Sequence, residues 1–292
     1  MKVIDIWKSA SKPVVSFELF PAKSNEAAEK LDKTIDALIE LKPSFFSVTF
    51  GAGGSTREGS YQLVYKLLKE KKVDVIAYFA GYGLNPADIN KVLDDFNAAG
   101  LENLLVVRGD PPKDEEYTPH PDSMSYADEL LRFIQPKYEF CLGAAGYPEG
   151  HIEAQSQDED LKYLKQKVEA GSEYIITNYF YDNVYFFDFV KRCEKIGINV
   201  PIIPGIMPIY SIKMMNILAN LCGATITDEL KKGLADLKPD NKEALISFGV
   251  NFALHQCRDL IEKGIPGLHF YTMDRKDSVE RIVKQLADED LI

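Results

Sequence analysis

The stretch Val14–Phe50, VVSFELFPAKSNEAAEKLDKTIDALIELKPSFFSVTF, decides the fold class of this chain. It opens with an apolar, β-rich run, Val14–Phe20, and closes with a second one, Phe45–Phe50. Between the two runs, apolar residues recur at the spacing of an amphipathic helix, at Leu31, Ile35, Leu38 and Leu41. A strand, a helix and a second strand form a unit that predicts a parallel sheet.

The same alternation continues along the rest of the chain. Six further apolar runs are expected to be strands: Asp74–Ala80, Asn103–Gly109, Tyr138–Ala145, Tyr174–Tyr181, Val200–Ile209 and Gly267–Met273. Helical segments separate them, and extra helices are expected between the seventh and eighth runs, at about 211–222, 227–237 and 241–263. Eight units without a serine- or glycine-rich linker predict an α/β fold, a (β/α)8 TIM barrel in which residues 1–292 form a single domain. An open doubly wound sheet is the alternative.

The composition excludes several classes of protein. With 46% hydrophobic and 27% charged residues, the 292-residue chain has enough apolar side chains for a full core. Its net charge of −11 is unfavourable for general nucleic-acid binding. The four cysteines form no C-x-x-C pair, and the first residues lack the apolar run of a signal peptide. We therefore expect a cytoplasmic protein without disulfides or a membrane span.

In a TIM barrel the chemistry lies where the strands end, so polar residues there are candidates. Glu18 lies among Phe17, Leu19 and Phe20, and burial would raise its pKa towards that of a general acid near neutral pH. A glutamate that pairs with lysine or faces solvent is the alternative. Asp110 follows the fourth run and serves either as a turn cap or as an electrostatic partner of Glu18.

Other motifs are less specific. His151 is interpreted as a loop residue, and His269 as a residue that forms hydrogen bonds inside the barrel. No H-x-x-x-H pattern indicates a metal site, and no G-x-S-x-G pattern indicates a serine hydrolase. The glycine-rich stretch GAGGSTREG differs from the dinucleotide-binding fingerprint and is weak evidence for phosphate binding.

Several segments together resemble the methylenetetrahydrofolate reductase family in its bacterial single-domain form. They run in family order from residue 16 to residue 275: SFELFPAK, SVTFGAGGSTR, VVRGDPP, AAGYPEGHIEA with DLKYLKQKVEAG, ITNYFYD, IIPGIMPI and LHFYTMDR. The family fold is a (β/α)8 barrel that holds FAD at the C-terminal ends of its strands. It agrees with the fold predicted from the alternation of strands and helices.

The resemblance also implies roles for individual residues. Glu18 would be the general acid that helps to open the five-membered ring of the folate, and Asp110 would stabilise the cationic intermediate near the flavin. FAD contacts are implied at Thr49, Tyr78, Val107, Arg108, Gly109, Asp110, Tyr126, Ala127, Ala145, Tyr147, His151, Asp160 and Lys167. Substrate contacts are implied at Glu18, Asn178, Leu218 and Arg275.

This sequence departs from the family pattern at some of these positions. Tyr78 replaces a histidine that contacts the flavin, and Asn178 replaces a glutamine that meets the substrate. Tyr163 and Gln166 stand where asparagine and arginine usually contact the cofactor, and Leu218 replaces a gating phenylalanine. These substitutions predict weaker FAD binding than is usual for the family.

The resemblance implies a flavoenzyme that reduces 5,10-methylenetetrahydrofolate to 5-methyltetrahydrofolate. NADH or NADPH would reduce FAD and leave before the folate binds, which gives ping-pong kinetics. A homo-oligomer is expected from the family. The alternatives are a flavin-free or partner-fed reductase, and a non-catalytic folate- or flavin-binding subunit. An aldolase-like barrel acting on sugar phosphates ranks last, because no strand run carries a suitable Schiff-base lysine.

Overall fold

The computed structural model describes residues 1–50, 54–109, 118–237 and 241–292, with residues 54–57 as backbone alone. Its strands are β1 (Val14–Leu19), β2 (Phe45–Val48), β3 (Val75–Ala80), β4 (Asn103–Val107), β5 (Cys141–Gly146), β6 (Tyr174–Tyr179), β7 (Ile202–Ile206) and β8 (Gly267–Tyr271). They form a closed barrel in the order β1 to β8, and each strand is parallel to its neighbours. The predicted (β/α)8 barrel is therefore confirmed.

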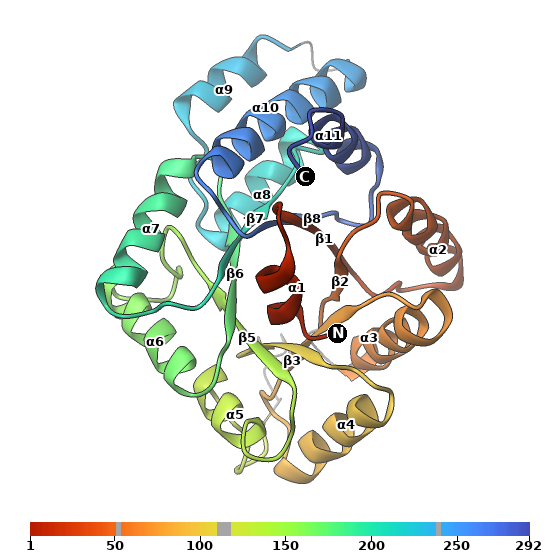
Figure 1. Cartoon of the computed structure of the whole chain (residues 1–292), viewed down its shortest axis with the longest axis vertical. Coiled ribbons are helices and arrows are strands. Elements are labelled where there is room, and N and C mark those ends of the chain that lie inside the picture. The colour runs from red at the N-terminus through yellow and green to blue at the C-terminus, as the bar shows by residue number, and fades with distance from the viewer. Residues whose placement is uncertain (51–53, 110–117, 238–240) are drawn as a thin grey trace.

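Helices surround the barrel on its outside (Figure 1). Those that follow β1 to β6 and β8 are α2 (Asn25–Ile39), α3 (Gly54–Lys66), α4 (Pro86–Ala98), α5 (Ala127–Ile134), α6 (Gln157–Glu169), α7 (Asn183–Lys195) and α11 (Asp277–Asp288). A π-helical turn, η1 (Leu67–Lys71), continues α3. The predicted extra helices between β7 and β8 are present as α8 (Ile212–Cys222), α9 (Asp228–Ala235) and α10 (Lys242–Glu262).

Local sequence signals account for several helix boundaries. The side-chain oxygen of Asn85 accepts a hydrogen bond from the N–H of Asp88 at 2.9 Å, and Pro86 is the first residue of α4. After α4, Gly100 has a φ of +77°, a conformation that glycine adopts without a Cβ clash. Local residues thus mark both ends of this helix.

Each strand is shorter than the apolar run that predicted it, and the fifth and seventh strands begin two or three residues later than their runs. The run Tyr138–Ala145 enters the sheet at Cys141, because the N–H of Tyr138 donates to the carbonyl of Ile134 at the end of α5. The run Val200–Ile209 pairs over Ile202–Ile206 only, and Pro208 has no N–H for a ladder bond.

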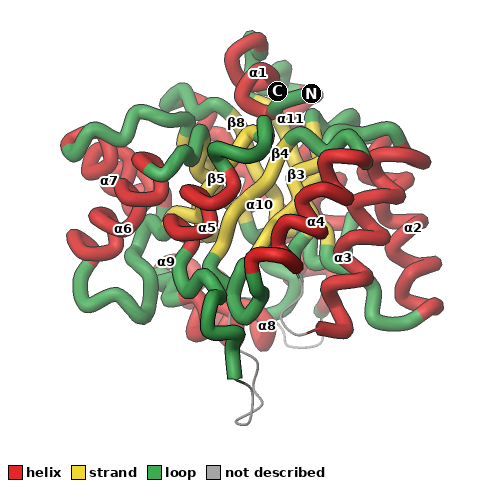
Figure 2. Tube along the Cα trace, turned by 90° about the horizontal axis from the view of Figure 1, so that it is seen from below, coloured by secondary structure: helices red, strands yellow, loops and turns green. Residues whose placement is uncertain are grey.

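A short helix that the sequence analysis did not predict, α1 (Val3–Ser9), closes one end of the barrel. Its Trp7 ring packs against Phe45 at 5.7 Å and Tyr174 at 5.2 Å between ring centroids. Figure 2 shows α1 at one end of the barrel and α8 at the other. The end beyond the C-terminal ends of the strands therefore remains for the site.

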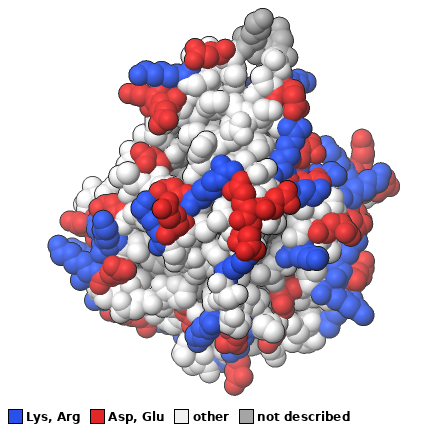
Figure 3. Space-filling view, turned by 45° about the horizontal axis from the view of Figure 1, so that its top comes forward, with Lys and Arg blue, Asp and Glu red and all other residues white. Residues whose placement is uncertain are grey.

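The surface carries charges of both signs. On the face shown in Figure 3, acidic and basic side chains are interspersed over the surface. Among the described residues, none of the helices combines the length and the apolar composition that crossing a membrane requires.

Candidate active site

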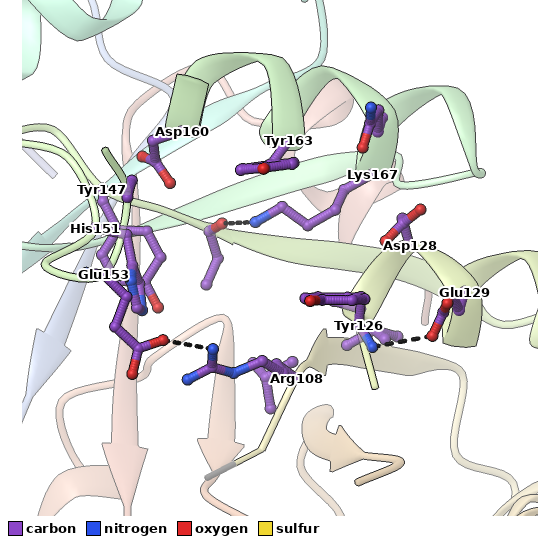
Figure 4. Close-up of a pocket in the computed structure, with 16 residues that line it drawn as sticks. Arg108, Tyr126, Asp128, Glu129, Tyr147, His151, Glu153, Asp160, Tyr163 and Lys167 are labelled. Atoms are coloured by element: carbon purple, nitrogen blue, oxygen red, sulfur yellow. Dashed lines mark hydrogen bonds and ion pairs between the residues drawn. The ribbon is translucent and has the colours of Figure 1, made fainter. Parts of the chain in front are cut away.

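A cavity of about 560 Å³ opens beyond β4 and β5, between the start of α5 and one side of α6 (Figure 4). Nine residues that the resemblance assigns to FAD line it: Val107, Arg108, Tyr126, Ala127, Ala145, Tyr147, His151, Asp160 and Lys167. Tyr163 and Gln166, the two substituted positions on α6, line it as well. The cavity lies within the size range of small-molecule and cofactor sites.

Helix caps orient two sides of this cavity. At the start of α5, the Glu129 carboxylate accepts hydrogen bonds from the N–H groups of Ser125 at 2.9 Å and Tyr126 at 3.1 Å. At the start of α6, Ser156 caps the helix by accepting from the N–H of Glu159 at 3.2 Å. Tyr126 and Tyr163 are 61% and 50% exposed, so their rings are available to a ligand in the cavity.

Lys167 is the cation at the inner wall of the cavity. Its ammonium group donates a hydrogen bond to the carbonyl of Ala145 at 2.8 Å, as the dashed line in Figure 4 shows. Burial lowers the pKa of Lys167, and the negative charges of Asp160 and Asp128 oppose that change. Burial likewise raises the pKa of Asp160, and Lys167 opposes it. The two groups therefore stabilise each other's charged forms.

A second charged pair lies across the cavity. The guanidinium of Arg108 contacts the carboxylate of Glu153 at 2.5 Å and lowers the pKa of that carboxyl. His151 accepts a hydrogen bond on Nδ1 from the N–H of Glu153 at 3.2 Å, and its ring packs edge-on against Tyr147 at 4.7 Å. Glu153 was not predicted, although it lies two residues after His151 in the AAGYPEGHIEA segment.

Glu18 lies inside the barrel near the end of β1 and is 3% exposed. Burial raises the pKa of its carboxyl to about 8, a hydrogen bond with Tyr78 lowers it, and the charge of Asp274 raises it further. The sequence analysis left open whether this carboxyl is buried or faces lysine or solvent. The structure places it in the barrel interior, with a pKa at which a general acid is protonated at neutral pH.

The loop after β8 holds Glu18 in place. Thr272 donates from its hydroxyl to the backbone carbonyl of Glu18 at 2.6 Å, and it accepts from the N–H of Asp274 at 3.1 Å. Neither residue was predicted to belong to the site, and Asp274 lies in the quoted segment LHFYTMDR. Asp274 could have been predicted as a site residue, because it is a carboxylate at the end of a barrel strand and next to Arg275.

The other predicted cofactor residues are Thr49, Tyr78, Gly109 and Asp110. The described residues that line the cavity do not include Thr49, Tyr78 or Gly109. Thr49 follows β2, and its N–H donates to the carbonyl of Leu19 at 3.1 Å. Gly109 follows β4 with a φ of +85°, and a Cβ there would lie 2.8 Å from that of Ala80, so this turn requires glycine. Asp110 lies outside the described residues.

The predicted substrate residues Asn178, Leu218 and Arg275 are not among the residues that line this cavity. On β6, Asn178 donates from its side-chain amide to the carbonyl of Cys222 at 3.4 Å, which joins β6 to the end of α8. Leu218 of α8 packs against an apolar cluster that includes Tyr179 and Met215. The Arg275 guanidinium lies over the Tyr210 ring at 5.5 Å.

Over the described residues, no group of three or more histidine, cysteine, aspartate or glutamate side chains has the arrangement of a metal site. The cysteines Cys141, Cys193, Cys222 and Cys257 are all free thiols.

Solved structures share this fold. A protein from Clostridium thermocellum, described as uncharacterized and as binding two copies of 5-methyl-5,6,7,8-tetrahydrofolic acid, superposes with a TM-score of 0.68. It is 18% identical, and the match covers 98% of each chain. Dihydropteroate synthase from Xanthomonas albilineans superposes with a TM-score of 0.50 at 12% identity, over 96% of this chain and 94% of that one. At these identities the likeness concerns the fold.

Sequence comparisons identify the family. Residues 3–287 match the family model for methylenetetrahydrofolate reductase. Methylenetetrahydrofolate reductase (NADH) 1 of Arabidopsis thaliana is 36% identical over 98% of this chain and 51% of its own length. Methylenetetrahydrofolate reductase 1 of Schizosaccharomyces pombe is 36% identical over 98% of this chain and 48% of its own length. The chain thus spans about half the length of these curated relatives, and it belongs to the methylenetetrahydrofolate reductase family.

Proposed function

We propose that this chain reduces 5,10-methylenetetrahydrofolate to 5-methyltetrahydrofolate, with NADH or NADPH as the electron donor and FAD as the cofactor. The observation that carries the proposal is the buried Glu18 carboxyl, with its pKa raised to about 8. Such a group keeps its proton at neutral pH until a substrate nitrogen takes it. The family membership supports the same assignment.

The cavity at β4 and β5 fits FAD by its size and its side chains. Lys167 and Arg108 are cations for the pyrophosphate, and Tyr126 and Tyr163 offer exposed aromatic rings to a flat heterocycle. When bound, the flavin would accept a hydride from the nicotinamide and supply it to the folate. The acidic residues Asp160 and Glu153 partly offset the two cations, which agrees with the looser binding predicted from the substitutions.

Glu18 supplies the proton that the folate reaction needs. The bond between the methylene carbon and one folate nitrogen breaks as that nitrogen takes the proton of Glu18, which leaves an iminium cation. A hydride then reduces the methylene carbon to the methyl group, and Glu18 is left as a carboxylate until solvent returns a proton. Stabilisation of the cation by Asp110 remains a proposal from the resemblance, because Asp110 lies outside the described residues.

Absorbance spectroscopy tests this function most directly. The purified protein is expected to show the flavin bands, to bleach when NADH or NADPH is added without oxygen, and to recover them when 5,10-methylenetetrahydrofolate follows. Comparing the bleaching rates with NADH and NADPH identifies the donor, and NADH is expected to be faster because the plant relative carries NADH in its name. A spectrum that neither donor changes contradicts the proposal.

A partner-fed reductase is the second candidate. The engagement of Arg108 by Glu153, and of Lys167 by the Ala145 carbonyl, leaves both cations with protein partners and so favours weak flavin binding. In that case the purified protein would be colourless and inactive with NADH alone. It would gain folate reduction when a reduced electron-transfer protein is supplied, which separates it from the first candidate.

A further inference from the structure

A chain of hydrogen-bonded polar side chains crosses the interior of the barrel and ends at Glu18. The Ser16 hydroxyl contacts Nδ1 of His269 at 2.8 Å, and the Ser47 hydroxyl contacts Nε2 of the same ring at 3.2 Å. The Tyr78 hydroxyl is hydrogen-bonded to Ser47 on one side and to the Glu18 carboxyl on the other. Ser16, Ser47 and His269 are each at most 1% exposed, so water does not compete for these bonds.

The barrel register brings these residues together. Glu18 on β1 lies opposite Ser47 on β2, and Ser16 lies opposite His269 on β8. Tyr78 lies on β3, next to β2, so its side chain reaches Ser47 and Glu18 from the other side. Adjacent parallel strands thus place residues from distant parts of the sequence in one row.

The hydrogen bond from Tyr78 lowers the pKa of Glu18, so the Tyr78 hydroxyl donates to the Glu18 carboxylate. The hydrogen bond with Ser47 lowers the pKa of Tyr78, so the Ser47 hydroxyl donates to the Tyr78 oxygen. Burial lowers the pKa of His269 to about 3, so the ring is neutral, with one nitrogen that donates and one that accepts. The Ser16 hydroxyl also donates to the carbonyl of Leu268 at 3.3 Å.

Tyr78 can serve Glu18 in either protonation state. When Glu18 is protonated, its O–H can donate to the Tyr78 oxygen. When Glu18 has lost its proton, the Tyr78 O–H turns to the carboxylate. A hydroxyl is both a donor and an acceptor, which an aromatic ring without the oxygen is not.

We propose that Tyr78 is a positioning residue for Glu18, which holds the carboxyl in place both before and after proton transfer. This deepens the proposed function and rests on it for its catalytic meaning. It differs from the flavin contact implied for Tyr78 by the resemblance. Because the row ends at the backbone carbonyl of Leu268, which only accepts, its role is to hold the carboxyl and not to conduct protons from solvent.

Other groups also face Glu18 and set the background for any pH measurement. Asp274, from the loop after β8, acts on the Glu18 carboxyl through its charge. Tyr271, on β8, faces Glu18 and donates its own hydroxyl proton to the carbonyl of Thr177 at 2.8 Å. Both remain unchanged in the variants below.

The test compares two variants by infrared spectroscopy of the purified protein, with no substrate added. The pKa of Glu18 is followed through the C=O band of its protonated carboxyl, which is assigned by its loss in Glu18→Gln. Tyr78→Phe removes the donor to the carboxylate and is expected to raise this pKa by on the order of one pH unit. Ser47→Ala removes the donor to the Tyr78 oxygen, which makes Tyr78 a weaker donor to the carboxylate, and is expected to raise the pKa of Glu18 by less than Tyr78→Phe does.

Tyr174→Phe is the matched control. Tyr174 is a buried barrel tyrosine that donates to the carbonyl of Leu104 at 2.9 Å, so the variant loses a comparable hydrogen bond without touching Glu18. It is expected to leave the pKa of Glu18 unchanged. If Tyr78→Phe does not fold, the shift expected in Ser47→Ala still decides the proposal.

An unchanged Glu18 pKa in folded Tyr78→Phe overturns the proposal, and so does a downward shift in Ser47→Ala. Because the measurement needs no turnover, it is independent of the proposed function. If the wild-type protein reduces no folate but both variants show the expected shifts, the pairing of Tyr78 with Glu18 stands and the proposed function is rejected. If the wild-type protein reduces folate but the variants do not show the shifts, the proposed function stands and the pairing of Tyr78 with Glu18 is rejected.

Discussion

The carboxylate of Asp274 accepts a hydrogen bond from the backbone N–H of Phe20 at 2.9 Å. This bond ties the loop after β8 to the chain just beyond β1, two residues after Glu18. Met273 and Asp274 both have left-handed backbones, with φ values of 50° and 55°, a conformation that residues other than glycine adopt at an energetic cost. The loop therefore holds a negative charge towards Glu18 in a backbone conformation that the surrounding contacts maintain.

Asp274→Asn is expected to lower the pKa of Glu18. The amide oxygen can still accept from the N–H of Phe20, whereas the charge that raises the pKa is gone. A general acid works only while it is protonated, so the rate of folate reduction falls as the pH rises through its pKa. In the variant this fall should begin at a lower pH than the value of about 8 that applies to the wild type.

Stopped-flow measurement of the folate half-reaction between pH 6 and pH 10 checks this expectation. Asp290→Asn is the control, because Asp290 is a 93% exposed carboxylate paired with Lys12 on the surface. It carries the same change in charge and should leave the pH profile in place. A profile that does not move in Asp274→Asn would show that this charge is screened from Glu18.

Glu18→Gln is expected to separate the two half-reactions. Reduction of the flavin by the nicotinamide needs no proton from Glu18, so its rate should stay within about threefold of the wild type. Folate reduction loses its proton donor and should slow by at least about a hundredfold. Stopped-flow absorbance measures both rates, and an equal loss in the two would assign Glu18 a structural role.

The same variant should change the pH dependence of stability. The pKa of Glu18 is about 8 in the folded protein and 4.5 ordinarily, so between these values the folded state holds a proton that the unfolded state has lost. The contribution of Glu18 to stability is therefore complete below pH 4.5 and is lost as the pH rises through 8. The Glu18→Gln variant has no such loss of stability, because glutamine does not titrate.

Urea unfolding at pH 5 and pH 8 measures this difference. Relative to the wild type, Glu18→Gln should gain stability with rising pH, by on the order of 1 kcal/mol per pH unit. Glu243→Gln is the control, since Glu243 is an exposed carboxylate whose pKa Arg281 lowers. If the two variants respond alike to pH, the carboxyl of Glu18 is not buried in solution.

The sequence predicted the barrel because each strand and helix carries its own period, and those periods are local. It left open whether Glu18 is buried among its apolar neighbours or faces lysine or solvent, because the surroundings of a side chain depend on distant parts of the chain. The pairing of Glu18 with Tyr78 was not predicted, because sixty residues separate them and only the register across β1, β2 and β3 brings them together. The short helix α1 was missed for a related reason: its seven residues are stabilised by Trp7 against distant rings.

The cavity at β4 and β5 also has features that the sequence predicted and features that it did not predict. The motif resemblance gave nine residues that line one cavity, because motifs record sequence order at strand ends. It did not give the partners of Arg108 and Lys167, since these depend on side-chain geometry within the folded cavity. Which charges remain available to a ligand is therefore a property of the fold and not of the motif.

Gln166→Arg is expected to tighten FAD binding. Gln166 stands where the family usually has an arginine, and it lines the cavity beside Lys167 on α6. A charge-assisted bond to the pyrophosphate contributes about 1.5–3 kcal/mol, and each 1.4 kcal/mol corresponds to about a tenfold change in affinity. Fluorescence titration of the protein with FAD should therefore show a gain of at least about tenfold. Gln285→Arg adds the same charge on α11, where Gln285 bonds to Glu289, and should leave the affinity unchanged. No gain in Gln166→Arg, or an equal gain in both variants, would mean that α6 does not face the phosphates of the cofactor.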